Sequence, residues 1–180
     1  MIRRALAIGL LTTVIIACGS DDSTRDLSGY AEGDPVPPVE NVEYLQGPPV
    51  AFDGTHNATI IEFWATWCAP CKESAPVLTA LQEKYGDQGV IVVGLSDEND
   101  ATVKPYLAAN GKDMAYTIGL DPDGVVQKAF IEGYSTEEIN GIPWAFLIDS
   151  KGTLVWKGHP MEEELEVQLK LLLESEEGDA

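Results

Sequence analysis

Two cysteines separated by two residues, Cys68 and Cys71, are the residues whose type and spacing point most directly to chemistry. They follow an apolar run and precede a segment with helical periodicity. This spacing lets two sulfur atoms bond within one helical turn. The first thiol then lies at the helix N-terminus, where backbone N–H groups and the helix dipole favour a thiolate. Because a thiolate is the species that attacks disulfides, the motif predicts a dithiol that exchanges disulfides.

A Cys-x-x-Cys pair also occurs in zinc sites and in structural disulfides. Zinc needs about four ligands, commonly two cysteine pairs or cysteines with histidines. The histidines of this chain, His56 and His159, are remote from the pair in sequence. A structural disulfide across two residues closes a very small loop, so it adds little stability. We therefore expect no metal here, and no cofactor other than a redox-active disulfide between Cys68 and Cys71.

The residues around the motif predict the elements that must position it. Residues 59–64 form a short β-branched and aromatic run, which is typical of a central strand. Residues 71–85 carry apolar side chains at helical spacing and stop at Gly86. Residues 90–95 predict a second buried strand. The cysteine pair is therefore expected at the junction of a buried strand and a helix.

The rest of the domain continues this alternation of strands and helices. The expected elements are a helix from Asn99 to about Ala109, a strand at residues 116–120, a short helix to about Phe130, a hairpin of residues 145–148 and 153–157, and an amphipathic helix at residues 161–174 with Pro160 at its start. Strands that alternate with helices, followed by a closing hairpin and helix, predict an α/β domain of three layers.

The N-terminus reads as a signal for export. Residues 1–4 are short and basic, and residues 5–16 are mostly apolar. About 12 apolar residues suit a signal peptide and are too few for a permanent membrane span. The run ends in Ile15-Ile16-Ala17-Cys18, which resembles a bacterial lipobox. We therefore predict a lipoprotein signal peptide at residues 1–17 and lipid attachment at Cys18. An uncleaved anchor, or an ordinary signal peptide with a chance cysteine, remains the alternative.

Composition separates a linker from the folded part. Residues 18–43 are rich in Asp, Ser, Gly, Pro and Glu and predict a flexible tether; we expect one globular domain at residues 44–174 and a polar tail at residues 175–180. The formal charge is −19, and it becomes −21 when Arg3 and Arg4 leave with the signal peptide. Nucleic acid is not an expected partner, because its binding needs clustered Lys and Arg. Acidic headgroups should repel the domain, so the membrane is expected to hold it through the lipid anchor.

Three segments resemble a known family. The sequence FWATWCAPCK at residues 63–72, Gly141-Ile142-Pro143, and FLIDSKG at residues 146–152 resemble the thioredoxin fold. Within that fold they are most similar to the TlpA-like membrane-anchored thiol–disulfide oxidoreductases, which include cytochrome c maturation reductases. The resemblance covers about residues 44–174. It implies a three-layer α/β/α sandwich with a central mixed sheet, a cis-proline loop and an inserted strand–helix segment between Leu95 and Ile142.

The resemblance also implies a role for each residue of the motif. Cys68 is the attacking thiol and Cys71 the resolving thiol. Trp67 flanks the attacking sulfur, which is expected to be more exposed than that of Cys71, and Ala69 and Pro70 tune the reduction potential. This resemblance implies no further cofactor.

Ile142 and Pro143 are implied to face the cysteine pair. The peptide bond before Pro143 is expected to be cis, and the backbone of Ile142 is expected to pair with an extended substrate segment in the substrate groove. Without the Cys-x-Pro-Cys motif, an edge-strand proline would be the simpler interpretation.

The chain departs from the family at one important position. Many relatives carry a glutamate three residues after the second cysteine, where this chain has Ser74. Plain thioredoxin instead has a buried carboxylate six residues before the first cysteine, and Glu62 occupies that position here. Our hypothesis is that Glu62 accepts the proton of Cys71, which must ionise to attack the mixed disulfide. The alternative is that Glu62 points to solvent from an alternating strand.

The leading interpretation is an enzyme, a monomeric protein-disulfide reductase on the extracytoplasmic, periplasmic side of a bacterial membrane. Its expected substrates are disulfides of exported proteins, with apocytochrome c suggested by the resemblance, and a thiol electron donor in the membrane must re-reduce it. A disulfide oxidase or isomerase of the same fold is the nearest alternative. A peroxiredoxin-like peroxidase would need an activating arginine, and none follows Arg25. A non-catalytic binding lipoprotein is the fourth possibility.

Overall fold

The computed structural model of the chain describes residues 32–37, 39–52, 55–132 and 141–178. The predicted signal peptide, Cys18 and the first part of the predicted tether lie outside the described residues. Within those ranges, no helix combines the length and the apolar character needed to cross a membrane.

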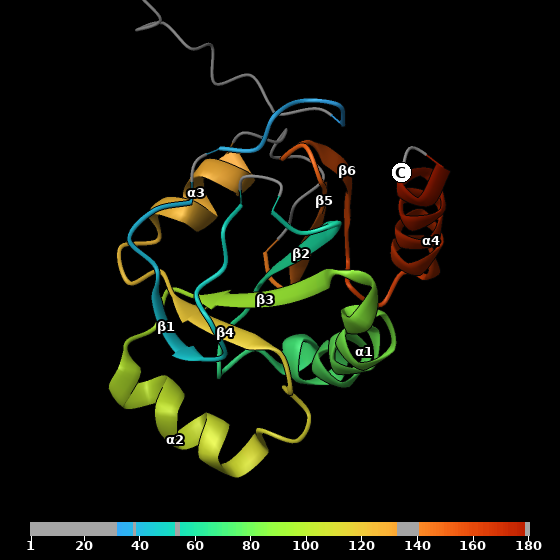
Figure 1. The fold of residues 1–180 in the computed structure, drawn as a ribbon. Helices are drawn as coiled ribbons and strands as arrows, with labels where there is room; N and C mark the ends of the chain where they lie inside the picture. Colours follow the sequence, from blue (N-terminus) through green and yellow to red (C-terminus); the bar gives the residue numbers. More distant parts are fainter. Residues whose placement is uncertain (1–31, 38, 53–54, 133–140, 179–180) are drawn as a thin grey trace, which may run out of the picture.

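Among the described residues, one mixed sheet of six strands forms the centre of the fold (Figure 1). The strands are β1 (Glu43–Gln46), β2 (Ala58–Phe63), β3 (Val90–Ser96), β4 (Thr117–Leu120), β5 (Trp144–Asp149) and β6 (Leu154–Gly158). They lie in the order β1-β4-β3-β2-β5-β6. The pairs β2–β3 and β3–β4 are parallel, and the other pairs are antiparallel. The predicted mixed sheet is thus confirmed.

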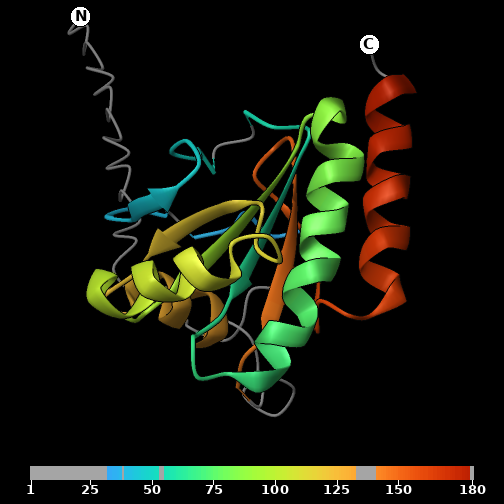
Figure 2. The same cartoon turned by 90° about the horizontal axis from the view of Figure 1, so that it is seen from below.

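Helices cover both faces of this sheet. They are α1 (Ala69–Tyr85), α2 (Asp100–Asn110), α3 (Val125–Glu132) and α4 (Glu163–Gly178), with a short 3-10 helix at Gly86–Gln88. Buried residues of α1, α2 and α4 join one apolar cluster, while those of α3 join a second cluster. Figure 2 shows α1 and α4 side by side along the same face. The predicted three-layer α/β/α architecture is confirmed. Between Leu95 and Ile142, where an inserted strand and helix were expected, lie α2, β4 and α3.

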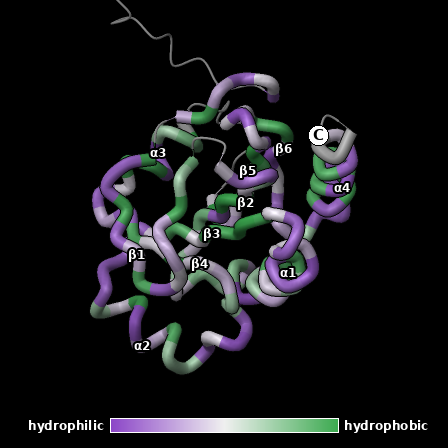
Figure 3. The backbone as a smooth tube through the Cα atoms, in the orientation of Figure 1, coloured by the Kyte–Doolittle hydropathy of each residue, from purple (hydrophilic) through white to green (hydrophobic). Residues whose placement is uncertain are grey.

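Strand β2 lies between the two clusters and is buried along its whole length. Because side chains alternate across a strand, Ile60 faces the cluster under α1 and α4, while Ile61 and Phe63 face the cluster under α3. Figure 3 shows hydrophobic residues concentrated in the central strands. This two-sided burial explains why the predicted strand reads as an almost continuous apolar run.

Most element boundaries follow local signals that the sequence carries. Helix α1 ends at Gly86 as predicted, and the Asn99 side chain accepts a hydrogen bond from the backbone N–H of Thr102 at the start of α2. The last helix differs from its prediction. It begins at Glu163 rather than at Pro160, because Glu162 accepts a hydrogen bond from the backbone N–H of His159 and closes a turn first. It also continues through Gly178, into the predicted polar tail.

The last part of the segment predicted as tether lies against the domain. The backbone N–H of Gly33 donates to the Leu154 carbonyl at 2.8 Å, and that of Val36 donates to the Gly152 carbonyl at 2.9 Å. Gly152 belongs to the turn between β5 and β6. Because β5 runs antiparallel to β2, this turn lies at the end of the sheet opposite the carboxyl end of β2, where the cysteine motif follows.

Candidate functional site

The first turn of α1 positions the cysteine pair. Cys68 is the N-cap residue with an extended backbone (φ −78°, ψ 107°), and its sulfur accepts a hydrogen bond from the backbone N–H of Cys71 at 3.2 Å. Pro70 lies within the first two helical positions, where its missing N–H costs nothing. The two cysteines are joined by a disulfide. The predicted placement of the first sulfur at a helix N-terminus is confirmed.

The two sulfurs differ in their neighbours rather than in their exposure. Both cysteines are 3% exposed in this oxidised state, so the predicted greater shielding of Cys71 is not seen. The Sγ atom of Cys68 lies 3.6 Å from the carbonyl oxygen of Ile142, and this contact contributes to its burial. Trp67, by contrast, is 71% exposed beside it. The Trp67 ring therefore remains open to solvent next to the Cys68 sulfur.

The segment before β5 brings Ile142 and Pro143 to the cysteines. The Ile142–Pro143 peptide bond is cis, as the resemblance implied. Strand β5 then begins with Trp144, which pairs with Phe63 at the carboxyl end of β2. The antiparallel pairing of β5 with β2 thus places residues 142–143 at the same end of the sheet as the motif.

Glu62 lies in the interior, on the face of β2 that α1 covers. Its side chain is 0% exposed, which excludes the alternative of a solvent-facing strand position. The Ser74 hydroxyl lies 2.9 Å from Oε1, and the Tyr116 hydroxyl donates a hydrogen bond to Oε2 at 3.1 Å. Desolvation raises the pKa of Glu62 to about 8, and these two hydrogen bonds partly oppose the rise.

Ser74 connects this carboxyl group to the cysteine motif. Its hydroxyl also lies 3.0 Å from the backbone carbonyl oxygen of Cys71. The sequence marked Ser74 only as a departure from the family. The signal that could have indicated its contact is its position three residues after Cys71, on the same buried face of the helix. No local signal indicates Tyr116, because its contact with Glu62 depends on where β4 lies in the sheet.

A second carboxylate, Glu98, holds the residue two positions before Cys68. Its oxygens accept hydrogen bonds from the backbone N–H of Thr66 at 2.6 Å and from the Thr66 hydroxyl at 2.8 Å. The Ser96 hydroxyl donates to the same carboxylate at 3.3 Å. Sequence reasoning did not identify Glu98. Its two contacts fix the loop that leads from β2 to the dithiol, and they give the Thr66 hydroxyl a structural partner.

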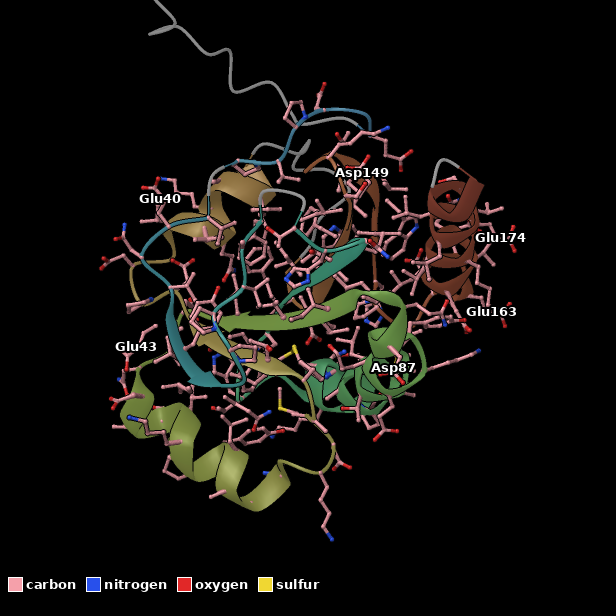
Figure 4. All side chains as sticks on the ribbon, viewed as in Figure 1. Glu40, Glu43, Asp87, Asp149, Glu163 and Glu174 are labelled. Carbon is pink, nitrogen blue, oxygen red and sulfur yellow. A yellow bond between two sulfur atoms is a disulfide. The ribbon has the colours of Figure 1, made fainter. Side chains whose placement is uncertain are left out.

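The remaining titratable side chains form no metal-binding cluster within the described ranges. No group of three or more His, Cys, Asp or Glu residues lies close enough there to hold a metal ion. The labelled carboxylates in Figure 4, on or beside β1, α1, β5 and α4, lie at separate places around the outside of the molecule. These carboxylates therefore do not form a single acidic patch beside the dithiol.

The chain is similar to known proteins that are named for thiol–disulfide chemistry. The chain is 32% identical over 113 residues to the thiol-disulfide oxidoreductase ResA of Bacillus thuringiensis subsp. konkukian, a match that covers 61% of this chain and 60% of the relative. It is 31% identical over 99 residues to the thiol:disulfide interchange protein CycY of Rhizobium leguminosarum bv. viciae, covering 55% of this chain and 48% of the relative. The chain thus spans 60% or less of the length of these two relatives.

A solved structure extends the similarity to the fold. The crystal structure of a putative thiol:disulfide interchange protein DsbE from Chlorobium tepidum has a TM-score of 0.63 and 27% identity, covering 81% of this chain and 99% of that chain. A family profile described as Redoxin matches residues 31–169, which is more than half of the sequence. Together with the dithiol at the start of α1 and the cis peptide bond beside it, this match places the chain in the Redoxin family with a thioredoxin-like fold.

Proposed function

We propose that this protein is an exported, lipid-anchored thiol–disulfide oxidoreductase that reduces disulfides of extracytoplasmic proteins. The observation that carries the proposal is the capping position of Cys68, whose sulfur accepts the backbone N–H of Cys71. A hydrogen-bond donor and the helix dipole both stabilise the thiolate that attacks a disulfide. The relatives named as thiol–disulfide oxidoreductases and thiol:disulfide interchange proteins support the same activity.

The proposed cycle uses two steps. The Cys68 thiolate attacks one sulfur of a substrate disulfide, forms a mixed disulfide and displaces the other substrate sulfur as a thiolate. Cys71 then loses its proton and attacks the Cys68 sulfur. The Cys68–Cys71 disulfide forms, and the second substrate sulfur leaves with its electron pair and takes up a proton. The substrate gains two electrons and two protons, which a membrane thiol donor must restore to the cysteine pair.

Glu62 is the proposed acceptor for the Cys71 proton. A carboxylate whose pKa is about 8 is a stronger base than an ordinary glutamate, so it is suited to take a proton from a thiol near neutral pH. Ser74 joins it to the first turn of α1, because the Ser74 hydroxyl lies within hydrogen-bonding distance of both Glu62 and the Cys71 carbonyl.

The activity is tested by trapping the mixed disulfide. The full chain with Cys71→Ser should form a stable covalent adduct with a disulfide-containing protein substrate, because the resolving thiol is absent. Cys68→Ser should form none through the attacking position. Cys18→Ser is the matched control, since it removes a cysteine outside the pair and should leave reduction unchanged. Adducts that form equally in the Cys68→Ser variant would contradict the proposed order of attack.

The anchoring proposal rests on the N-terminal sequence. Residues 1–17 are the proposed signal peptide and Cys18 the lipid-bearing residue. The chain enters the domain beside the β5–β6 turn, opposite the dithiol, and this entry point favours a dithiol that faces away from the membrane. Metabolic labelling with a radioactive fatty acid should mark the parent chain and not Cys18→Ser. Equal labelling of both would overturn lipid attachment at Cys18.

Cytochrome c maturation is the proposed setting, with apocytochrome c as the substrate. The TlpA-like oxidoreductases, which this sequence resembles, include proteins of that process. A strain that lacks this protein should accumulate apocytochrome c with an oxidised cysteine pair, and the Cys68→Ser chain should fail to restore the reduced form. Normal haem attachment in that strain would contradict this substrate.

A further inference from the structure

Glu62 is held by side chains from two elements that are distant in sequence. Ser74 lies 12 positions after it, on α1, and Tyr116 lies 54 positions after it, directly before β4. Both side chains are buried, at 0% and 4% exposure. Each carboxyl oxygen therefore has one hydroxyl partner in a region that excludes water. A carboxyl group that is buried without partners loses its hydrogen bonds to water, which costs free energy. The two hydroxyl groups offset part of this cost.

The backbone of β3 is adapted to this arrangement. Glu62 pairs with Gly94 in the parallel register of β2 and β3. A Cβ atom at Gly94 would lie 3.1 Å from Cε2 of Tyr116 and 3.0 Å from Nε1 of Trp64, which is closer than ordinary packing allows. The missing side chain thus leaves the space through which the Tyr116 ring reaches Glu62.

The Ser74 hydroxyl has one proton and two acceptors. Glu62 Oε1 lies at 2.9 Å and the Cys71 carbonyl oxygen at 3.0 Å. When Glu62 is ionised, the hydroxyl donates to the carboxylate. When Glu62 is neutral with its proton on Oε1, the carboxyl group donates to the Ser74 oxygen, and the hydroxyl proton is free for the Cys71 carbonyl. The hydroxyl can therefore satisfy Glu62 in both charge states.

The Tyr116 hydroxyl, unlike that of Ser74, keeps one role in both charge states of Glu62. Burial raises the pKa of its phenol well above 10, and the nearby Glu62 charge adds to the rise, so the hydroxyl stays protonated and donates to Oε2 at neutral pH. Other titratable groups on this face include Cys68, which caps α1, Cys71 and Tyr85 of α1, and Tyr106 of α2. The pKa of Tyr106 is also raised, first by burial and then by Asp113 and Glu62. Lys72 lies over the Tyr106 ring, 5.6 Å from its centre. The Tyr116 and Ser74 hydroxyl groups are thus the partners that oppose the effect of burial on Glu62.

We propose that Ser74 and Tyr116 are positioning residues that hold the Glu62 carboxyl group beside the first turn of α1 and set the pH at which it accepts the Cys71 proton. The Ser74 hydroxyl turns from Glu62 to the Cys71 carbonyl as that proton arrives. The Cys71 thiolate then attacks the Cys68 sulfur and the substrate thiolate leaves, so no other reactant is needed. This inference rests on the proposed role of Glu62 as the acceptor.

The test separates the two cysteine steps by kinetics. The reduced full chain is mixed with a small aromatic disulfide whose thiolate absorbs visible light. The first release of thiolate depends on reagent concentration and reports Cys68. The second release is unimolecular and reports the attack by Cys71. The rate of the second release is measured from pH 5 to pH 10 for the parent and for each variant.

Removing either hydroxyl group should shift the midpoint of the pH profile and leave the plateau rate of the second release unchanged. Tyr116→Phe and Ser74→Ala each remove a hydrogen bond to the charged form, so the midpoint should rise by about one pH unit and the rate at pH 7 should fall about tenfold. Ser74→Thr keeps a hydroxyl and should restore most of the rate. Tyr106→Phe is the matched control, because it removes a phenol of the same face that does not hydrogen-bond to Glu62, and its midpoint should equal that of the parent.

Combining the variants with Glu62→Gln separates the positioning roles of Ser74 and Tyr116 from the acceptor role of Glu62. Glu62→Gln should abolish the midpoint near pH 8, and Tyr116→Phe should then add less than about twofold. A parent-like midpoint in both Tyr116→Phe and Ser74→Ala, with an altered Glu62→Gln profile, would overturn the positioning roles alone. A parent-like profile in Glu62→Gln would overturn the acceptor role of Glu62 and this inference with it.

Discussion

The two faces of the central strand β2 differ in what they bury: apolar rings on one side and an ionisable carboxyl group on the other. Towards α3, Phe63 packs against Phe130 and Phe146 with ring centres 5.6 Å and 5.8 Å away, in a cluster of apolar side chains. Towards α1, the same strand places the ionisable Glu62 in the interior. One face therefore contributes packing energy, while the other keeps a carboxyl group whose burial opposes stability. A costly buried group beside a redox pair is typical of a functional site.

Removing the Cys68 sulfur, on the α1 side of the sheet, should have the largest effect on activity. Cys68→Ser should reduce the rate of protein-disulfide reduction to the uncatalysed level, because no thiolate remains at the α1 cap. The measurement is the reduction of a disulfide-containing protein by the full chain with a thiol donor. Residual activity close to that of the parent would show that another group attacks the substrate.

Removing a ring from the opposite face should affect folding instead. Phe130 is fully buried and contacts both Phe63 and Phe146, so Phe130→Ala should lower the free energy of unfolding by about 3–5 kcal/mol. The reduction potential of the cysteine pair should stay unchanged in the folded variant. Denaturant unfolding and equilibration with thiol buffers measure the two quantities. A shifted potential with unchanged stability would reverse the assignment of the two faces.

The cost of burying Glu62 should appear as a dependence of stability on pH. The folded state raises the pKa from 4.5 to about 8. Between these values the folded chain binds more protons than the unfolded chain, so the stability present below pH 4.5 is lost as the pH rises through about 8. At pH 7 the loss is up to about 3 kcal/mol, and Glu62→Gln should remove it.

This prediction is measured by denaturant unfolding of the oxidised chain at a series of pH values, so that the cysteines do not titrate. Glu163→Gln, on the exposed surface of α4, is the matched control and should keep the slope of the parent. A parent curve that does not fall between pH 5 and pH 8 would contradict the burial of an ionisable Glu62.

The smallest expected effect concerns the loop between β2 and α1. Glu98→Ala removes two hydrogen bonds to Thr66, so the rate of attack by Cys68 should fall about fivefold, equivalent to about 1 kcal/mol. Glu98→Gln keeps one acceptor and should lie between the parent and Glu98→Ala. The first, concentration-dependent release of aromatic thiolate measures this rate. An unchanged rate in Glu98→Ala would show that the loop holds its position without the carboxylate.

Sequence reasoning reached the parts of the site that local pattern determines. The Cys-x-x-Cys motif at a strand–helix junction, the cis bond before Pro143 and the burial of Glu62 each followed from a short segment or from the family resemblance. Tyr116 and Glu98 could not be reached in this way, because their contacts join residues 54 and 32 positions apart. The start of α4 was misplaced because Pro160 suits a first helical turn, whereas the hydrogen bond between His159 and Glu162 closes a separate turn there.

The reduction potential of the Cys68–Cys71 pair tests the central claim, that this dithiol donates electrons to substrate disulfides. It is measured by equilibrating the full chain with thiol buffers of defined potential and quantifying the oxidised fraction. A dithiol that reduces substrate disulfides should have a value near or below about −230 mV, within the range of thioredoxin and glutaredoxins. A value near about −120 mV would mark a disulfide donor and would contradict the proposed direction of electron flow.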